Sequence, residues 1–491
     1  MSAVLIWLIL APIVLALIAA LIDKTVFRWA LAGAGSLGYA VLVSMTVWYV
    51  WGQGPVHATI GGWSVPWGIG LRVDELSALF YLLLGLGLAG AMLFIGSTRG
   101  FNRGESPLLF LLAGAGAGIL AAADLFNLFV FVELAAVCTA ALIALKGAGP
   151  EGRRDSGAAG FLYLVLASAS GMILLVSIML IYAATGQLNM DEIAGRIHAM
   201  APLPYAAAAA GVVAAFGVKI GLVPLHFWQA RAYAAAGSAQ AAFLSGVAMK
   251  LYLYAMLRIL GHPLAVAQQA PALLSALLVI GAVNVLLGHI MALAQRDLRR
   301  LLAFSSVAHL GYILMGFGAG TRLGLVAAIL HVVNHVMMKT ALFWSGHVLC
   351  RQTRSADWRR FRGCAEAQPL IFAAFIVASL AIVGVPLTGG FASKWLVSVA
   401  AFEQFGLWPV LVVAMGTIIS AVYYARIIRM CLGRHSTQDQ ERSRATATVT
   451  APRFVVAARV PPTLAAVACL AVGMGIRWVL PWVERAAGAL H

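Results

Sequence analysis

Ionisable side chains lie inside several stretches of this chain that are otherwise apolar. Glu133, Lys219, Lys250 and Lys394 are the clearest cases. A charge at the centre of a bilayer costs at least about 2.5–3.5 kcal/mol, so each such residue is a functional candidate by default. Loss of solvent disfavours the charged form of a lysine, and a nearby carboxylate favours it. The four residues therefore suit reversible proton binding, with Glu133 and Lys219 as a pair whose separation controls the proton.

The segment HVVNHVMMK (331–339) adds a second kind of proton-binding group. His331, His335 and Lys339 recur at intervals of four, which places them on one face of a helix. Histidine changes its charge near neutral pH without help, so the two imidazoles are candidate relays between fixed lysines. Asn334 and Lys339 are assigned supporting roles in the same segment.

Glycine and proline interrupt two apolar segments beside a lysine. Lys219 precedes the run that ends at Pro224, and Lys394 follows the run GVPLTGG (384–390). Broken backbone survives inside a membrane only where protein or water satisfies its polar groups, so each interruption predicts a polar pocket next to its lysine. His226, just after the first interruption, is given a supporting role.

Other interpretations stay open for some of these residues. Lys339 and Lys146 lie near segment ends, where a lysine can extend to the membrane interface. Glu133 can be a purely structural partner, and the four histidines His226, His289, His309 and His347 are interpreted by default as ordinary core residues. No Walker A, G-x-S-x-G or H-E-x-x-H pattern is present, and the five cysteines show no C-x-x-C spacing. We therefore expect no catalytic residues, no cofactor and no metal site.

The composition identifies the elements that must position these groups. Of 491 residues, 62% are hydrophobic and only 10% are charged, against roughly 25% charged in a soluble domain. Long unbroken apolar runs favour membrane helices over barrel strands, and the 50 glycines favour close helix packing. The fold class predicted is all-α and polytopic. Fourteen transmembrane helices are expected, beginning near residues 3, 26, 76, 107, 125, 157, 203, 238, 270, 301, 322, 368, 406 and 456.

The net charge of +16 indicates orientation rather than nucleic-acid binding, because the basic residues lie in short loops. Loops after odd-numbered helices hold 20 Lys and Arg residues, and loops after even-numbered helices hold 4, namely Arg72, Arg196, Arg258 and Arg322. The positive-inside rule then places the odd loops in the cytoplasm and both termini outside. We expect a multi-pass protein of a bacterial inner membrane, with residues 4–21 as a first membrane helix rather than a signal peptide.

Two pairs of prolines indicate an internal duplication. Pro107 and Pro271 are 164 residues apart, and Pro224 and Pro386 are 162 apart. Five helices per unit is an odd number, so the two units must be inverted, as in many transporters. The predicted divisions are 1–106 for helices 1 to 3, 107–261 and 262–433 for the two five-helix repeats, and 434–491 for a cytoplasmic loop and helix 14.

Six ordered segments resemble the antiporter-like family shared by Mrp-type cation/proton antiporters and the membrane arm of respiratory complex I, and the first two are most similar to the D component of the Mrp antiporters. They are GGWSVPWGIGLRVDELSAL (61–79), DLFNLFVFVE (124–133), VKIGLVPLHFWQARAYAAA (218–236), DLRRLLAFSSVAHLGYIL (297–314), HVVNHVMMK (331–339) and GVPLTGGFASK (384–394).

The resemblance implies fourteen helices with two inverted five-helix units and broken helices 7 and 12. It also implies Glu133 and Lys219 as the modulating ion pair, Lys250 as the central lysine, His331 and His335 as linking histidines, and Lys394 as the terminal lysine. Such subunits act within complexes of several membrane subunits. One departure is the segment after PLHFW, where Gln229, Arg231 and Tyr233 stand in place of the usual Leu-Pro-Asp-Ala pattern.

These observations predict a proton-translocating, antiporter-like subunit of a multisubunit membrane complex, with cation/proton antiport as the expected process. Other membrane subunits, the lipid bilayer, protons and sodium are the expected partners. Two alternatives stay open: a proton-pumping membrane subunit of a complex I-like or hydrogenase oxidoreductase, and a subunit that couples proton flux to uptake of another solute such as inorganic carbon.

Overall fold

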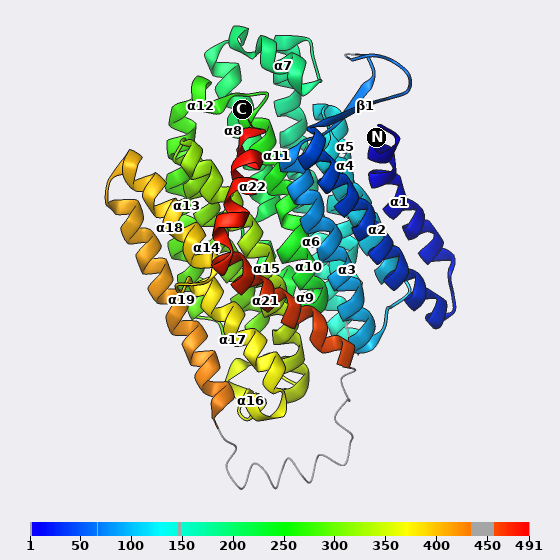
Figure 1. Ribbon diagram of the computed structural model, residues 1–491, viewed down its shortest axis with the longest axis vertical. Helices are drawn as coiled ribbons and strands as arrows, with labels where there is room; N and C mark the ends of the chain where they lie inside the picture. The colour runs from blue at the N-terminus through cyan, green and yellow to red at the C-terminus, as the bar shows by residue number, and fades with distance from the viewer. Residues whose placement is uncertain (1, 66, 146–148, 434–455, 491) are drawn as a thin grey trace.

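A computed structural model describes residues 2–65, 67–145, 149–433 and 456–490 (Figure 1). Nearly all of them are helical, and 12 helices in this part of the chain are long and apolar enough to cross a membrane. The all-helical, polytopic fold is therefore confirmed. The count of fourteen stays a prediction, because α4 (Glu105–Ala121) and α17 (Pro369–Val383) are apolar but shorter than the other spans.

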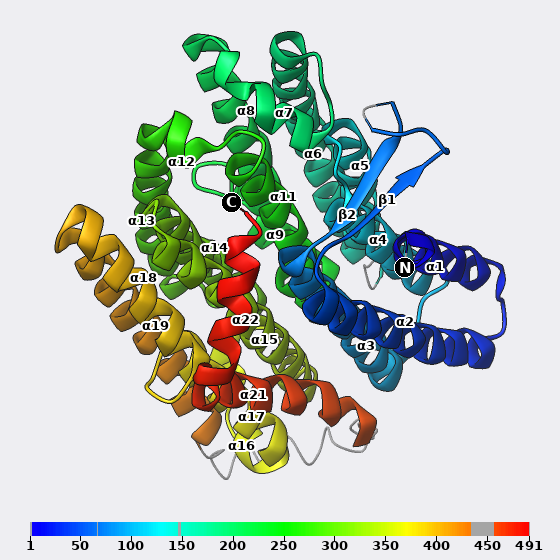
Figure 2. The ribbon, with the colours of Figure 1, turned by 45° about the horizontal axis from the view of Figure 1, so that its top comes forward.

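The first three long helices form one flank of the molecule, as Figure 2 shows. They are α1 (Ser2–Leu21), α2 (Thr25–Gln53) and α3 (Glu75–Arg99). Between α2 and α3 the chain forms an antiparallel hairpin of β1 (Val56–Ile60) and β2 (Ile69–Val73). This hairpin was not predicted from the sequence. Its strands have only five residues each, and long apolar runs indicate helices but not such short strands.

The helices that follow carry the first interruption. They are α5 (Leu125–Ala144), α6 (Gly149–Thr185), α7 (Met190–Arg196), η1 (Ile197–Ala199), α8 (Pro202–Ile220), α9 (Phe227–Ala236), α10 (Ser238–Phe243), the π-helical turn η2 (Leu244–Ala248) and α11 (Met249–Gly261). Asp124 caps the start of α5 by accepting a hydrogen bond from the Asn127 backbone N–H.

The remaining helices carry the second interruption. They are α12 (Val266–Gln269), α13 (Pro271–Leu293), α14 (Leu298–Gly318), α15 (Arg322–Thr353), η3 (Trp358–Arg360), α16 (Cys364–Ala367), α17, α18 (Gly389–Phe405), α19 (Trp408–Leu432), η4 (Val456–Arg459), α21 (Val460–Met474) and α22 (Ile476–Gly488). The inverted repeat and the four predicted divisions stay predictions, and residues 434–455 lie outside the described residues.

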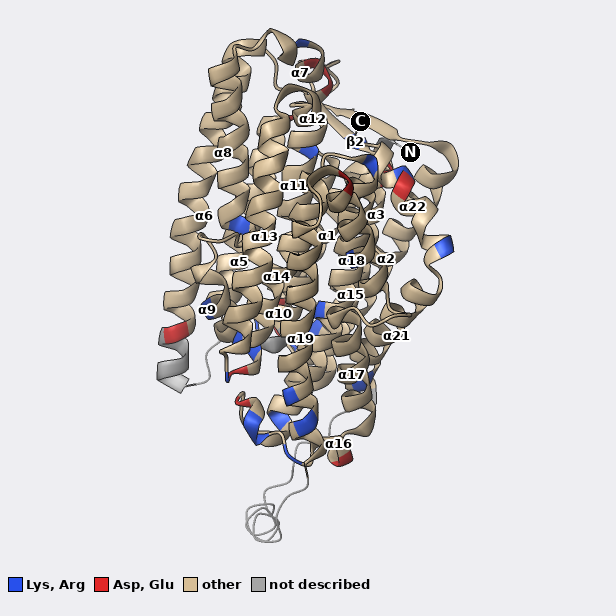
Figure 3. Ribbon diagram, turned by 90° about the vertical axis from the view of Figure 1, so that its left-hand side faces the viewer, with Lys and Arg blue, Asp and Glu red and all other residues tan. Residues whose placement is uncertain are grey.

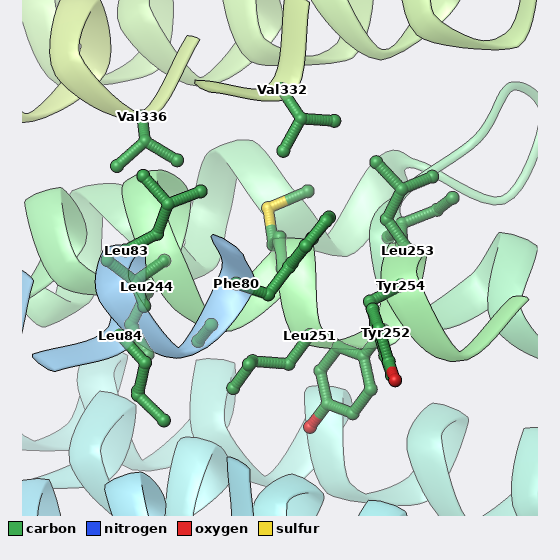
Figure 4. Close-up of a cluster of buried hydrophobic side chains, with 14 of the residues drawn as sticks. Phe80, Leu83, Leu84, Leu244, Leu251, Tyr252, Leu253, Tyr254, Val332 and Val336 are labelled. Carbon is green, nitrogen blue, oxygen red and sulfur yellow. The ribbon is translucent and has the colours of Figure 1, made fainter. Parts of the chain in front are cut away.

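Burial separates a central group of helices from the flank. The most apolar windows of α14 and α15 are 94% buried and that of the span Gln240–Gly261 is 100% buried, against 33% for α1 and α2. Figure 4 shows part of the core, where apolar side chains of α3, η2, α11 and α15 meet. Polar residues on the central helices therefore face protein rather than lipid.

Helices α13 and α14 approach each other closely along a seam of glycines. A Cβ at Gly281 or Gly288 of α13, or at Gly311 or Gly318 of α14, would lie 2.4–2.7 Å from a backbone atom of the opposite helix. No larger residue fits these positions without moving a helix. The predicted use of glycine for close packing holds at this seam.

Basic side chains gather at the end of the molecule that carries α16 (Figure 3). One of the arginines predicted in loops after even-numbered helices, at the opposite end, does not lie in a loop: Arg258 lies inside α11, is 4% exposed and pairs with Asp74 at 2.7 Å. The prediction for Arg258 was wrong because its buried partner is 184 residues away in the sequence. Lys146 lies outside the described residues.

Candidate functional site

The first interruption separates α8 from α9. Gly221 ends α8 with φ +77°, a left-handed conformation that favours glycine. Pro224 then has no N–H to continue a helix. The Val223 N–H, which lies between them, donates a hydrogen bond of 3.0 Å to Oδ1 of Asn284 on α13. A side chain from a distant helix thus supports the broken backbone.

Glu133 and Lys219 form an ion pair beside this break. Lys219 Nζ lies 2.9 Å from Glu133 Oε1 and donates a second hydrogen bond of 3.0 Å to the Ala167 carbonyl. The lysine side chain is fully buried, whereas the glutamate is 27% exposed. Gly171 makes room for the carboxylate, since a Cβ there would lie 2.3 Å from Glu133 Oε1.

Lys250 follows the π-helical turn η2 in the centre of the protein. Such turns leave part of the helical hydrogen-bond pattern open, and Lys250 Nζ donates to the Ser245 carbonyl there. The Ser245 hydroxyl lies 2.9 Å from the Ser306 hydroxyl on α14. Within the described residues Lys250 has no carboxylate partner, and its ammonium is held by a backbone carbonyl.

Four buried histidines meet between α13, α14 and α15. His309 Nδ1 lies 3.0 Å from His331 Nε2, and the rings of His309 and His335 stack at 5.3 Å. His331 Nδ1 lies 2.9 Å from the Ser393 hydroxyl on α18. The fourth, His289, lies 5.7 Å from His309 between ring centroids. We call His289, His309, His331 and His335 the histidine cluster.

The second interruption separates α17 from α18 and positions Lys394. Lys394 Nζ donates to the carbonyls of Ile382 at 3.0 Å and Val383 at 2.9 Å, both in the last turn of α17. These carbonyls are available because helix ends leave their last acceptors unpaired. The ammonium also lies 4.7 Å from the ring centroid of Tyr312.

Asn334 and Thr388 support this second break. Asn334 Nδ2 donates a 2.7 Å hydrogen bond to the Gly389 carbonyl, and the Thr388 hydroxyl caps α18 by accepting from the Phe391 N–H. Gly473 of α21 packs against the same loop, because a Cβ there would lie 2.3 Å from the Leu387 carbonyl oxygen. The second break therefore has supports from α15, α18 and α21.

Two of the supporting residues predicted from sequence lie at the margin of this arrangement. Lys339 is fully buried and donates a 2.8 Å hydrogen bond to the Leu302 carbonyl, so its interpretation as a lysine that extends to the interface does not hold. His226 follows the first break and lies 3.2 Å from the Met291 sulfur, outside the histidine cluster.

In the unusual segment after the first break, two polar residues point into the protein and the arginine does not. The Gln229 amide lies 3.3 Å from the Tyr233 hydroxyl and 3.0 Å from the Met249 sulfur, and both Gln229 and Tyr233 are buried. Arg231 is exposed on the other side of α9. The arginine that replaces the family's usual acidic residue thus stays out of the protein interior.

Sequence reasoning missed several polar residues of the site. His289 and His309 were interpreted as ordinary core histidines, yet they lie in the histidine cluster. His289 also bonds at 3.1 Å to the hydroxyls of both Tyr312 and Tyr423. The available signal was weak, because each is a single histidine in an apolar run with no periodic partner on its own helix.

A separate ionic group lies at the opposite end from α16 (Figure 1). Asp191 of α7 accepts a 2.6 Å hydrogen bond from His262 and forms a 3.1 Å ion pair with Arg72 of β2. The His262 hydrogen bond, together with Arg72, holds the pKa of the Asp191 carboxyl below its usual range. This group connects the hairpin, α7 and the end of α11.

Ammonium, imidazole and hydroxyl groups are buried together on the helices around the two breaks. Groups of these types can bind and release protons. In the part of the chain that the structure describes, no group of three or more His, Cys, Asp or Glu side chains could hold a metal ion.

Comparison with known proteins agrees with this geometry. Residues 122–420 match the family described as NADH:quinone oxidoreductase/Mrp antiporter, transmembrane. NADH-quinone oxidoreductase subunit N of Desulforudis audaxviator is 37% identical over 76% of this chain and 75% of its own length. The D component of the Na(+)/H(+) antiporter of Alkalihalophilus pseudofirmus is 29% identical over 72% of this chain and 71% of its own length.

A solved structure is similar over the whole chain. It is a chain of the membrane-bound sulfane sulfur reductase, an archaeal respiratory membrane complex, with a TM-score of 0.89, 27% identity, and coverage of 100% of this chain and 98% of that one. The matched family covers more than half of the residues, including both breaks and the histidine cluster. The chain therefore belongs to the NADH:quinone oxidoreductase/Mrp antiporter family, as an antiporter-like, multi-pass membrane subunit.

Proposed function

We propose that this chain translocates protons along the buried groups between Lys219 and Lys394, within a complex of several membrane subunits. One observation carries the proposal: ionisable and hydroxyl groups are buried together on the central helices between the two breaks. The Tyr252 ring centroid lies 5.8 Å from Lys219 Nζ. Lys250 donates to the Ser245 carbonyl, and the Ser245 hydroxyl contacts Ser306. In the second unit His309 contacts His331, and His331 contacts Ser393, the residue before Lys394.

The roles follow from the chemistry of each position. Glu133 and Lys219 are the pair whose separation controls proton binding at the first break. Lys250 is the central acceptor, His331 and His335 are relays, and Lys394 is the terminal acceptor. His226, Asn334 and Lys339 support this path without carrying the proton. The two five-helix units, 107–261 and 262–433, would each contain one break.

Cation/proton antiport is the process we propose, with sodium as the cation and other membrane subunits as partners. The antiporter relative supports this choice. The membrane would be a bacterial inner membrane, with the basic end that carries α16 in the cytoplasm and both termini outside. Orientation can be tested by labelling single cysteines at the two ends of the protein in intact cells.

Replacement of the lysines tests the translocation proposal directly. Lys219→Ala and Lys394→Ala are introduced into the native complex, and proton uptake is measured in proteoliposomes with a pH-sensitive dye. We expect translocation to be abolished in both while the complex still assembles. Arg231→Ala, which removes an exposed basic side chain of α9, is the control. Full activity in both lysine variants would refute the proposed path.

A second candidate is a redox-linked proton pump. It is favoured by the 37% identity to an oxidoreductase subunit. The two candidates differ in their partners, so mass spectrometry of the natively purified complex separates them. Iron–sulfur or flavin subunits would support the pump, and small membrane subunits alone would support antiport.

A further inference from the structure

Asn284 of α13 is a buried polar residue that the proposed proton path does not use. It is fully buried, and both ends of its amide are engaged. Nδ2 donates a 2.7 Å hydrogen bond to the Ile280 carbonyl of its own helix, and Oδ1 accepts the Val223 N–H at 3.0 Å. The first contact fixes the amide orientation, so the acceptor oxygen is aimed at the break.

The first break depends on this acceptor. The N–H groups of Gly221 and Leu222 bond back to carbonyls of α8, and Pro224 has no N–H. Val223 is thus the position in the break whose N–H has a side chain as its acceptor. A buried N–H without a partner is strongly unfavourable, so removal of the Asn284 oxygen leaves the break without this support.

The bond also joins two parts of the molecule. Asn284 lies in the second proposed unit, whereas the break lies in the first. Five residues further along α13, or about 7.5 Å along the helix axis, His289 bonds to the hydroxyls of Tyr312 and Tyr423. One rigid helix, held against α14 by the glycine seam, therefore contacts both the first break and the histidine cluster.

We infer that Asn284 is a positioning residue that clamps the first break from the second unit. The Val223–Asn284 bond holds α8 so that Lys219 reaches Glu133 and the Ala167 carbonyl. When Lys219 leaves Glu133 and the break moves, the Val223–Asn284 bond must either open or move α13 with the break. The functional part of this inference rests on the proposed function, but the existence of the clamp does not.

The test uses three variants of the native complex. Asn284→Leu removes the acceptor at similar size, and Asn284→Asp retains an acceptor oxygen. Ser275→Ala is a control elsewhere on α13, where the hydroxyl bonds to the Pro271 carbonyl of its own helix. Hydrogen–deuterium exchange at the Val223 amide, read by mass spectrometry, reports the bond itself. Proton uptake in proteoliposomes reports its consequence.

We expect amide exchange at Val223 to rise about fivefold in Asn284→Leu, which is the effect of one neutral hydrogen bond, and proton uptake to fall about threefold. Ser275→Ala should keep the exchange of the parent protein. Asn284→Asp keeps an acceptor oxygen but loses the donor to the Ile280 carbonyl, so its exchange and uptake should lie between those of the parent and of Asn284→Leu. If Asn284→Leu does not assemble, Asn284→Ala is measured in the same way.

Two results would overturn the inference. Unchanged exchange at Val223 in the leucine or alanine variant would show that the bond does not hold the break. Raised exchange with unchanged proton uptake would show that the clamp does not position Lys219. If Lys219→Ala itself leaves uptake unchanged, the proposed function fails, and the exchange measurement still tests the clamp.

Discussion

The two helix breaks hold their lysines in different ways. At the first, Lys219 precedes the break and its ammonium pairs with the Glu133 carboxylate at 2.9 Å. At the second, Lys394 follows the break and its ammonium is held by the carbonyls of Ile382 and Val383. An ion pair responds strongly to the state of its partner, whereas backbone carbonyls keep their partial charge. We therefore expect the contact of Lys219 to respond more strongly to a change of charge than the contacts of Lys394.

The supports of the two breaks differ in the same sense. Among the described residues, two side-chain hydrogen bonds hold the first: the Val223 N–H donates to Asn284 on α13, and Trp228 Nε1 of α9 donates to the Val218 carbonyl at 2.8 Å. The second has the Thr388 cap, the Asn334 bond and backbone packing against Gly473. We therefore expect the first break to move more easily than the second.

The largest effect is expected from Glu133→Gln at the first break. The amide oxygen of the variant can still accept a hydrogen bond from Lys219, but the buried ammonium loses the opposite charge at 2.9 Å. Breaking a buried ion pair costs about 3–5 kcal/mol, less where one partner is partly exposed. We expect proton uptake by the native complex to fall at least about tenfold. Glu192→Gln on α7, where the carboxylate is 42% exposed, is the control. Equal uptake in the two variants would remove the distinction between the breaks.

A smaller effect is expected from Gly473→Ala at the second break. The new Cβ would lie 2.3 Å from the Leu387 carbonyl oxygen and 2.5 Å from the Thr388 carbonyl carbon, so α21 must move away. Overpacking of this kind costs about 1–3 kcal/mol. Thermal unfolding of the purified complex should show a lower Tm. Gly488→Ala in α22, where no neighbouring atom lies within 4 Å, should leave the Tm unchanged or slightly higher.

Asn334→Leu compares the side-chain support of the second break with that of the first, and its effect should be smaller still. The variant loses two hydrogen bonds, to the Gly389 carbonyl and to the Ser393 hydroxyl, each worth about 1 kcal/mol. It keeps the Thr388 cap and the contact with α21. We expect proton uptake to fall less than in Asn284→Leu, measured side by side. A greater loss in Asn334→Leu would mean that the second break is the more mobile one.

The smallest effect is expected from Asp191→Asn, which lies away from both breaks. Asp191 is about half exposed, so its ion pair contributes less than about 1 kcal/mol. Because its folded-state pKa is below the unfolded value of about 3.9, its contribution is present above that pH and is lost as the pH falls through the folded-state pKa. The difference in Tm between variant and parent should therefore shrink as the pH is lowered below about 4. A difference that is unchanged there would contradict this assignment.

The sequence predicted those residues that stand out from their neighbours along the chain. A charge inside an apolar run is conspicuous, so Glu133, Lys219 and Lys394 were found, and the glycine–proline runs beside the lysines marked both breaks. The apolar runs likewise predicted the helices. The histidines at intervals of four on α15 were found by the same kind of local pattern.

The remaining residues could not be predicted in this way because their contacts depend on which helices pack against each other. His309 meets His331 only because α14 packs against α15. Asn284 resembles any polar residue of an apolar helix until the broken backbone of α8 lies beside it. Arg258 was placed in a loop because its partner, Asp74, is at the start of a different helix.

The glycine seam between α13 and α14 sets the tolerance of the histidine cluster. His289 and Tyr312 lie on opposite sides of this seam and meet at 3.1 Å. A single methyl group at Gly288 would lie 2.5 Å from the Ala308 backbone nitrogen, and the helices would have to separate by more than that hydrogen bond can stretch. The hydrogen bond between His289 and Tyr312 thus depends on four glycines, which let the two helices approach because they have no side chain.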